Sequence, residues 1–213
     1  MAAWAVGGGL PIAILFAWLL SRQRFPGRPV LNMLVHLPLV LPPVVTGLLL
    51  LLVFGVRGPV GHLLFSWLGI RLAFTTAGAS LACAVMTLPI MVRSVRLALD
   101  SADPGLEASA RTLGAGTLDR LLNVTLPLAL PGILVGGVVG YATCLGEFGA
   151  VITFAANIPG ETQTLPLAIY AALQAPGGED RALRLSMVSL LLAGTGLLVS
   201  EWLGHRLRAT LGR

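Results

Sequence analysis

The chain contains five long stretches without Asp, Glu, Lys or Arg, over residues 1–21, 29–56, 72–92, 121–146 and 185–200. A helix needs about 20 mostly apolar residues, within a range of roughly 17–25, to cross the hydrocarbon core of a membrane. Four stretches meet this length, and the fifth reaches it if it continues through residues 201–203. The sequence therefore predicts an all-α integral membrane protein with about five transmembrane helices, in one domain over residues 1–213.

The composition excludes an ordinary soluble domain. Charged residues make up 11% of the 213 residues and hydrophobic residues 56%, whereas a soluble domain carries about 25% charged residues. A transmembrane β-barrel would show segments of about ten residues in which apolar side chains alternate, and these stretches do not alternate. The first stretch also lacks the basic start of a secretory signal peptide, because its arginines follow it, so we interpret it as a span.

The arginines indicate an orientation in the membrane. If successive spans alternate in direction, ten arginines lie on one side: Arg22, Arg24, Arg28, Arg93, Arg96, Arg111, Arg120, Arg206, Arg208 and Arg213. The other side has Arg57, Arg71, Arg181 and Arg184. We expect the protein in the inner membrane of the cell. Because cytoplasmic loops carry an excess of Lys and Arg, we expect its N-terminus outside and its C-terminus in the cytoplasm. The basic residues flank apolar stretches, so we expect contact with membrane lipid and not with nucleic acid.

The longest cytoplasmic segment predicts two short helices joined by a glycine elbow. Asp103 is a good N-cap, and Pro104 suits the first helical position, where its missing N–H costs nothing. Gly114 and Gly116 are expected to end this helix, and Thr117 to cap the second. On these residues alone, an ordinary solvated loop with incidental helices is an equal alternative. As an elbow of small residues, the segment would let the surface of another protein approach closely.

One stretch in this segment resembles a family signature. Residues 107–114 read E-A-S-A-R-T-L-G and are followed by Thr125-Leu126-Pro127. This resembles the E-A-A…G…L-P signature of ABC-importer permeases, with Ser109 in place of the second alanine. In that family the loop, here about residues 100–122, forms coupling helices that dock into clefts on cytoplasmic ATPase subunits. The resemblance assigns the ATPase-coupling role to Glu107, Ala108, Ala110, Arg111, Leu113, Gly114, Leu126 and Pro127.

Further stretches resemble one branch of the family. Residues 36–45, 91–99, 126–133, 145–150 and 157–162 look like the molybdate permeases, which are close to the sulfate and tungstate permeases. The resemblance runs from about residue 14 to residue 213, and it implies the type I ABC importer permease fold and the import of molybdate. It also implies three partners: a second copy of the chain, a dimer of cytoplasmic ABC ATPase subunits that bind ATP and Mg²⁺, and a periplasmic or extracellular oxyanion-binding protein. Sulfate and tungstate remain alternative substrates, because all three ions are tetrahedral dianions.

A secondary transporter or channel is the alternative of a different class. Such proteins usually show an intramembrane ionisable relay or inverted repeats, and the sequence shows neither. Catalysis has no support, because the sequence lacks a G-x-x-x-x-G-K-[ST] loop, an H-E-x-x-H pair and a G-x-S-x-G elbow. We therefore expect a non-enzymatic subunit with no catalytic residue, no metal site and no cofactor of its own. Cys83 and Cys144 are expected to be buried in the spans.

The translocation pathway is expected to bind its ion weakly. No apolar stretch has an Arg or Lys near its centre, where a charge would cost about 2.5–3.5 kcal/mol and usually marks an ion site. Selectivity is therefore expected mainly in the separate binding protein. Pro42 and Pro43 interrupt the second span, either to improve packing or to direct freed carbonyls into a cavity. In the fourth span, Gly136 and Gly140 form a G-x-x-x-G pair that we expect at a close helix contact, with the contact between two copies as one candidate.

Glu147 is the most unusual charge, because it follows the 26-residue stretch 121–146 directly. We expect it near the outer end of the fourth span, at a gate, in a helix-end hydrogen bond or among lipid headgroups. Thr143 and Thr153 are the candidate hydroxyl donors to a passing oxyanion. Residues 154–182 contain prolines and a Gly-Gly pair and are expected to form an external loop or a re-entrant stretch, and not a full span.

Overall fold

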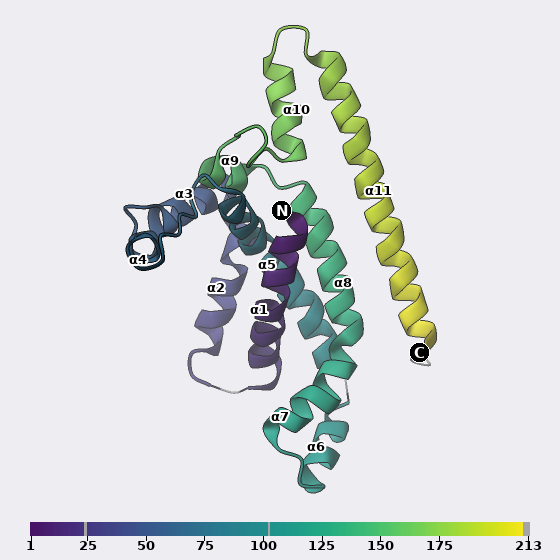
Figure 1. The fold of residues 1–213 in the computed structure, drawn as a ribbon. Helices are drawn as coiled ribbons and strands as arrows, with labels where there is room; N and C mark the ends of the chain where they lie inside the picture. Colours follow the sequence, from purple (N-terminus) through teal and green to yellow (C-terminus); the bar gives the residue numbers. More distant parts are fainter. Residues whose placement is uncertain (24, 102, 211–213) are drawn as a thin grey trace.

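The computed structural model describes residues 1–23, 25–101 and 103–210, and in these ranges the regular structure is helical, without strands (Figure 1). Pro104, Glu107, Leu197 and most residues after 199 are described by their backbone alone. The helices are α1 (Ala2–Arg22), α2 (Arg28–Val40), α3 (Pro43–Phe54), α4 (Pro59–Leu68), α5 (Thr76–Ser101), α6 (Pro104–Thr112), α7 (Thr117–Arg120), the π-helix η1 (Leu121–Thr125), α8 (Leu126–Leu145), α9 (Gly149–Ala155), α10 (Leu165–Gln174) and α11 (Glu179–Thr210). The predicted all-α fold is confirmed.

Three helical segments of the described chain are long and apolar enough to cross a membrane: Ala2–Arg22, Thr76–Ser101 and Thr117–Leu145, the last of which joins α7, η1 and α8. They coincide with the first, third and fourth predicted spans. The fifth predicted stretch, 185–200, lies within α11.

The second predicted span, 29–56, is sharply bent. Its two helices, α2 and α3, meet at an angle of 119°. Leu41 and Pro42 have extended ψ angles of 142° and 134°, because a residue that precedes proline is held away from the α region. Pro43 then takes the first position of α3, where no N–H is needed. The prolines thus end one helix and begin another that runs across its direction (Figure 1).

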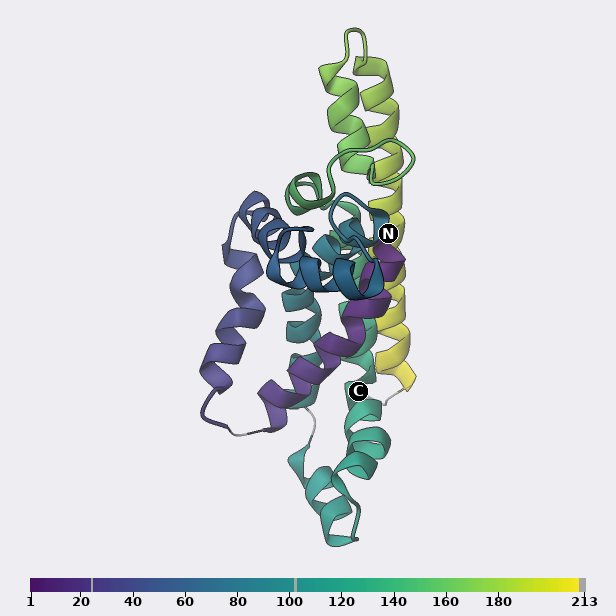
Figure 2. The same ribbon diagram turned by 60° about the vertical axis from the view of Figure 1, so that its left-hand side comes forward.

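α5 is the central helix, packed against both α1 and α8 (Figure 2). Its contact with α8 is close: a β-carbon on Gly132 would lie 2.5 Å from the Ala98 Cβ, and one on Gly140 would lie 2.9 Å from the Met91 Cγ. Gly136 lies on the same face and is also buried. This stripe of small residues is therefore covered by α5 of the same chain. The predicted close helix contact is confirmed, and its partner is α5 in place of the candidate second copy.

The two ends of the bundle carry different elements. α6 and α7 lie at one end, toward which the C-terminal ends of α1 and α5 also point, at the bottom of Figure 1. The connection between α10 and α11 lies at the opposite end. The segments 100–122 and 154–182, predicted for opposite sides of the membrane, thus lie at opposite ends of the molecule.

Candidate functional site

The first candidate site is the elbow formed by α6 and α7. A carboxylate oxygen of Asp103 accepts the N–H of Gly105 at 2.8 Å, which confirms the predicted N-cap of α6. Gly114 connects the helices with a φ of +88°, a left-handed conformation that favours glycine. The predicted cap at Thr117 is wrong, because the extended residue Gly116 is the N-cap of α7 and Thr117 is its first residue.

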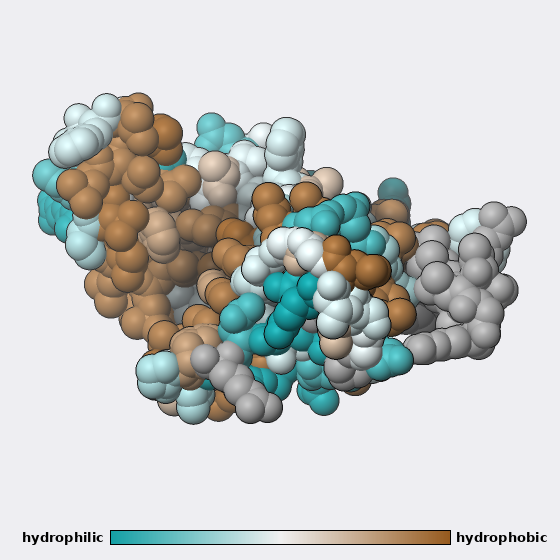
Figure 3. All heavy atoms as spheres, turned by 90° about the horizontal axis from the view of Figure 1, so that it is seen from below, coloured by the Kyte–Doolittle hydropathy of each residue, from teal (hydrophilic) through white to brown (hydrophobic). Residues whose placement is uncertain are grey.

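Large apolar side chains are exposed on this elbow. Leu113 is 87% exposed and Leu118 is 68% exposed, and Leu106 and Leu122 are also exposed. Seen from this end, the region of the elbow is largely hydrophilic with apolar patches, whereas the lobe on the left of the view is mostly apolar (Figure 3). Exposed leucines on an otherwise hydrophilic end are typical of a surface that another protein covers.

The predicted coupling residues fall into two groups. Four exposed positions on the elbow are Ala108, Arg111, Leu113 and Gly114, and Ala110 there is half-buried. The side chain of Glu107 lies outside the described residues. Leu126 and Pro127 instead lie at the start of α8, directly after the π-helical turn η1. That turn follows from Pro127, which has no N–H to donate and whose ring crowds the preceding turn. These two residues connect the elbow to the long span.

The second candidate site is the contact between α3 and α9, which brings together parts of the predicted pathway. A β-carbon on Gly149 would lie 2.7 Å from the Pro43 Cβ. One turn further along α3, a β-carbon on Gly47 would lie 2.7 Å from the carbonyl oxygen of Ala150 and 2.8 Å from the Thr153 Cβ. The two helices therefore approach to a distance that only glycine permits, with Pro43 and Thr153 at the contact.

The polar side chains of the predicted pathway are engaged with the backbone. Glu147 is 9% exposed, and its Oε1 accepts a backbone N–H of α9 at 3.0 Å. The hydroxyls of Thr153 and Thr143 donate to carbonyls of their own helices at 2.8 Å and 2.9 Å. Pro42 is exposed at the break between α2 and α3. The structure thus places Pro43, Glu147 and Thr153 on or beside α9, and Thr143 separately on α8.

Thr46 is a polar residue of this region that the sequence reasoning missed. It is 5% exposed, and its hydroxyl has no hydrogen-bond partner among the described residues. It precedes Gly47 on α3, the helix that packs against α9. A single threonine in a long apolar stretch carries no signal that distinguishes a buried position from one facing lipid.

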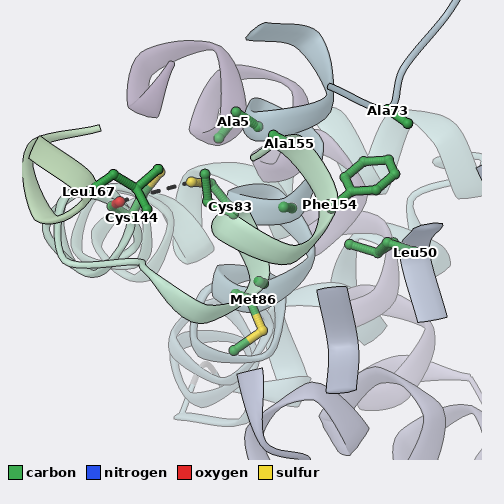
Figure 4. Close-up of a cluster of buried hydrophobic side chains, with 13 residues drawn as sticks. Ala5, Leu50, Ala73, Cys83, Met86, Cys144, Phe154, Ala155 and Leu167 are labelled. Atoms are coloured by element: carbon green, nitrogen blue, oxygen red, sulfur yellow. Dashed lines mark hydrogen bonds between the residues drawn. The ribbon is translucent and has the colours of Figure 1, made fainter. Parts of the chain in front are cut away.

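The two cysteines lie together between α5 and α8. The thiol of Cys83 donates to the backbone carbonyl of Cys144 at 3.9 Å (Figure 4). Both are free and buried, as predicted. No group of three or more His, Cys, Asp or Glu residues within the described ranges is arranged to hold a metal ion. The two cysteines belong to the packed core that also contains Phe154 and Leu167.

The match to a known family spans nearly the whole chain. Residues 9–206 match the family described as the binding-protein-dependent transport system inner membrane component. The chain belongs to this family. The predicted identity as the permease subunit of a binding-protein-dependent importer is thereby confirmed.

Several proteins similar to this permease are named as molybdenum transport permeases. It is 55% identical over 209 residues to the molybdenum transport system permease protein ModB of Escherichia coli (strain K12), covering 98% of this chain and 91% of that protein. It is 48% identical over 204 residues to ModB of Haemophilus influenzae, covering 96% and 89%. The sulfate transport system permease protein CysT of Salmonella typhimurium is 40% identical over 161 residues, covering 76% of this chain and 58% of that protein. The resemblance to the molybdate branch, with sulfate permeases close to it, is thus confirmed.

Solved structures show that the permease has the fold of ABC importers. A bacterial ABC transporter involved in the import of the acidic polysaccharide alginate matches with a TM-score of 0.72 and 21% identity, over 96% of this chain and 75% of that chain. An amino acid ABC transporter with histidines matches with a TM-score of 0.65 and 18% identity, over 96% and 88%. At these identities the likeness establishes the fold alone.

Proposed function

We propose that this permease translocates molybdate across the inner membrane into the cytoplasm, in an importer driven by ATP. The observation that carries the proposal is the 55% identity over 98% of the chain to a molybdenum permease. The apolar stretches hold no Arg or Lys near their centres, so the ion would pass without a strong site that traps it. Selection would then fall to a separate oxyanion-binding protein, which docks at the outer end, near the connection between α10 and α11.

The elbow of α6 and α7 is the proposed docking surface for cytoplasmic ATPase subunits, which bind ATP and Mg²⁺. Its exposed Leu113 and Leu118 support this role, because they would be covered in such a complex. The elbow also joins α5 to α8 through the chain, and these two spans pack closely along the glycine stripe of α8. A displacement of the elbow by the ATPase would therefore move two spans as one unit.

The complete importer in this proposal contains two copies of the permease, one on each ATPase subunit. The N-terminus and the connection between α10 and α11 lie outside, and the elbow and the C-terminus lie in the cytoplasm. The distribution of arginines supports this orientation, with ten of the 14 on the inner side.

Substitution on the elbow tests the coupling. Leu113→Asp and Glu107→Arg are expected to reduce co-purification of the ATPase at least tenfold and to stop molybdate uptake in cells that depend on this importer. Leu173→Asp is a matched control, since Leu173 is exposed on α10 at the opposite end. It is expected to leave ATPase co-purification unchanged. Unaltered co-purification and uptake in both elbow variants would refute the docking surface.

Sulfate is the second candidate substrate, because a sulfate permease is 40% identical over 161 residues. Competition of labelled molybdate uptake by unlabelled molybdate, tungstate and sulfate separates the candidates. We expect molybdate and tungstate to compete at far lower concentrations than sulfate. Competition by sulfate at the lowest concentration would instead assign the importer to sulfate.

A further inference from the structure

A pocket that includes several polar and charged side chains lies between α2 and α5, separate from both sites described above. It has a volume of about 330 Å³, roughly ten times the ~30 Å³ that a water molecule occupies in the liquid. Its lining residues are Asn32 and His36 from α2, and Arg93, Arg96, Leu97 and Asp100 from α5. The pocket therefore has room for a small hydrated ion, and two arginines lie in its wall.

One of the two arginines is held in place. Arg96 donates from Nη1 to the Oδ1 of Asn32 at 3.0 Å, and its Nε lies 3.4 Å from the Oδ2 of Asp100. These contacts use two of the five N–H donors of a guanidinium and fix its plane. The remaining donors are available to an anion. Arg96 is therefore a positioned cation in the pocket wall.

The second arginine has no such contacts. Arg93 is exposed and has no hydrogen-bond or ion-pair partner among the described residues. It precedes Arg96 by three positions, so the two side chains project from neighbouring positions on one face of α5. The ring of His36 bonds through Nδ1 to the carbonyl of Asn32 at 2.8 Å, which leaves Nε2 for another group. Arg93 is thus a guanidinium without a protein partner among the described residues, beside the fixed guanidinium of Arg96.

The one acidic group in the pocket wall does not neutralise both arginines. Asp100 is engaged at both oxygens, since Oδ2 faces Arg96 and Oδ1 accepts the hydroxyl of Ser21 at 2.5 Å. Arg22 lies close to this end as well, and its Nη2 donates to the carbonyl of Leu99 at 2.9 Å. The pocket is therefore net positive, with an unpaired arginine as its free cation.

We propose that this pocket binds a tetrahedral oxyanion group through Arg93 and Arg96. Arginine forks match the oxygens of such a group and form charge-assisted hydrogen bonds to them. Arg93 lies 8 residues before Ser101, the last residue of α5, which is about 12 Å along the helix. The pocket thus lies in the part of the bundle nearest the elbow, where its arginines attract an anion that can leave again.

Two sources can supply an oxyanion group at this position. One is the transported ion itself, which would bind in the pocket last before its release into the cytoplasm. This identification rests on the proposed function and orientation. The other is the phosphate of an anionic lipid headgroup in the inner leaflet. Both use the same chemistry, and the experiment is arranged to separate them.

Protection of a cysteine in the pocket wall tests the proposal. Leu97→Cys is prepared in the full chain in complex with its ATPase, in nanodiscs of phosphatidylcholine, and its rate of maleimide modification is followed. The native Cys83 and Cys144 are buried and contribute little background. We expect sodium molybdate to slow the modification saturably at constant ionic strength, and Arg93→Gln to raise the half-protecting concentration about tenfold. Arg93→Lys should restore part of the protection, whereas Arg181→Gln, an exposed arginine at the opposite end, should have no effect.

The second arm replaces phosphatidylcholine with phosphatidylglycerol. If molybdate gives no protection but this lipid slows modification in a manner that depends on Arg93, the oxyanion group is a lipid phosphate and the pocket stands. Absence of protection by both overturns the pocket. Molybdate uptake by the unsubstituted importer is measured in parallel. A failure of uptake refutes the proposed function, while uptake with no protection by either the ion or the lipid refutes the pocket alone.

Discussion

Glu147 shows how a carboxylate is accommodated at the end of an apolar span. Burial of an ionised group is costly unless hydrogen bonds replace its water, and Glu147 is 9% exposed. Its Oε1 receives the N–H of Ala150 at 3.0 Å, one of the N–H groups at the start of α9 that have no partner within the helix. The side chain therefore stabilises the start of α9, and with it the contact between α9 and α3.

Substitution of Glu147 separates this hydrogen bond from the charge. Glu147→Ala is expected to lower the free energy of unfolding by about 1 kcal/mol, as for the loss of other helix caps, and to lower the thermal midpoint in detergent by about 2–4 °C. Glu147→Gln keeps an oxygen acceptor, so its thermal midpoint should stay close to that of the unsubstituted protein. Equal losses in the two variants would show that the negative charge, and not the hydrogen bond, is what the site needs.

At the scale of elements, neighbouring residues predicted where helices begin and end, whereas contacts between helices far apart in the sequence could not be predicted. The Asp103 cap and the Gly114 elbow follow from neighbouring residues, and both are present. The proline break was visible in the sequence, but the 119° angle was not, because it depends on how α3 packs against α9. Likewise, a G-x-x-x-G pair predicts a close contact without naming the partner, which is α5. The same holds for the pocket, where Asn32 meets Arg96 from 64 residues away.

The contact between α3 and α9 can be tested at Gly47. A β-carbon there would lie 2.7 Å from a backbone oxygen, so Gly47→Ala forces the helices apart, and overpacking of this kind costs about 1–3 kcal/mol. Gly8→Ala on α1 is the matched control, because a β-carbon there meets nothing within 4 Å. Alanine is the better helix former by about 1 kcal/mol, so Gly8→Ala should hold or raise the thermal midpoint. Gly47→Ala should lower it by several degrees and reduce uptake; a midpoint as high as that of Gly8→Ala would contradict the close contact.

For the whole molecule, the arrangement of the ends and the distribution of arginines together support the proposed orientation. The elbow and the connection between α10 and α11 lie at opposite ends of the bundle. The helix arrangement alone does not say which end faces the cytoplasm, whereas the arginines predict it, since ten of the 14 fall on one side if successive spans alternate. The fold thus places the two segments at opposite ends, and the charge distribution predicts which end is cytoplasmic. The proposed coupling to a cytoplasmic ATPase depends on both.

Thiol labelling from one side of the membrane tests this orientation. Leu113→Cys places a thiol on the elbow, and Pro176→Cys places one in the connection between α10 and α11; both positions are exposed. In spheroplasts, a membrane-impermeant maleimide should label Pro176→Cys and spare Leu113→Cys, and permeabilisation should make Leu113→Cys reactive. The unsubstituted protein controls for Cys83 and Cys144, which are 1% and 3% exposed and should stay unlabelled throughout. Labelling of Leu113→Cys in intact spheroplasts would place the elbow outside, where no cytoplasmic ATPase can reach it, and would refute the coupling proposal together with the orientation.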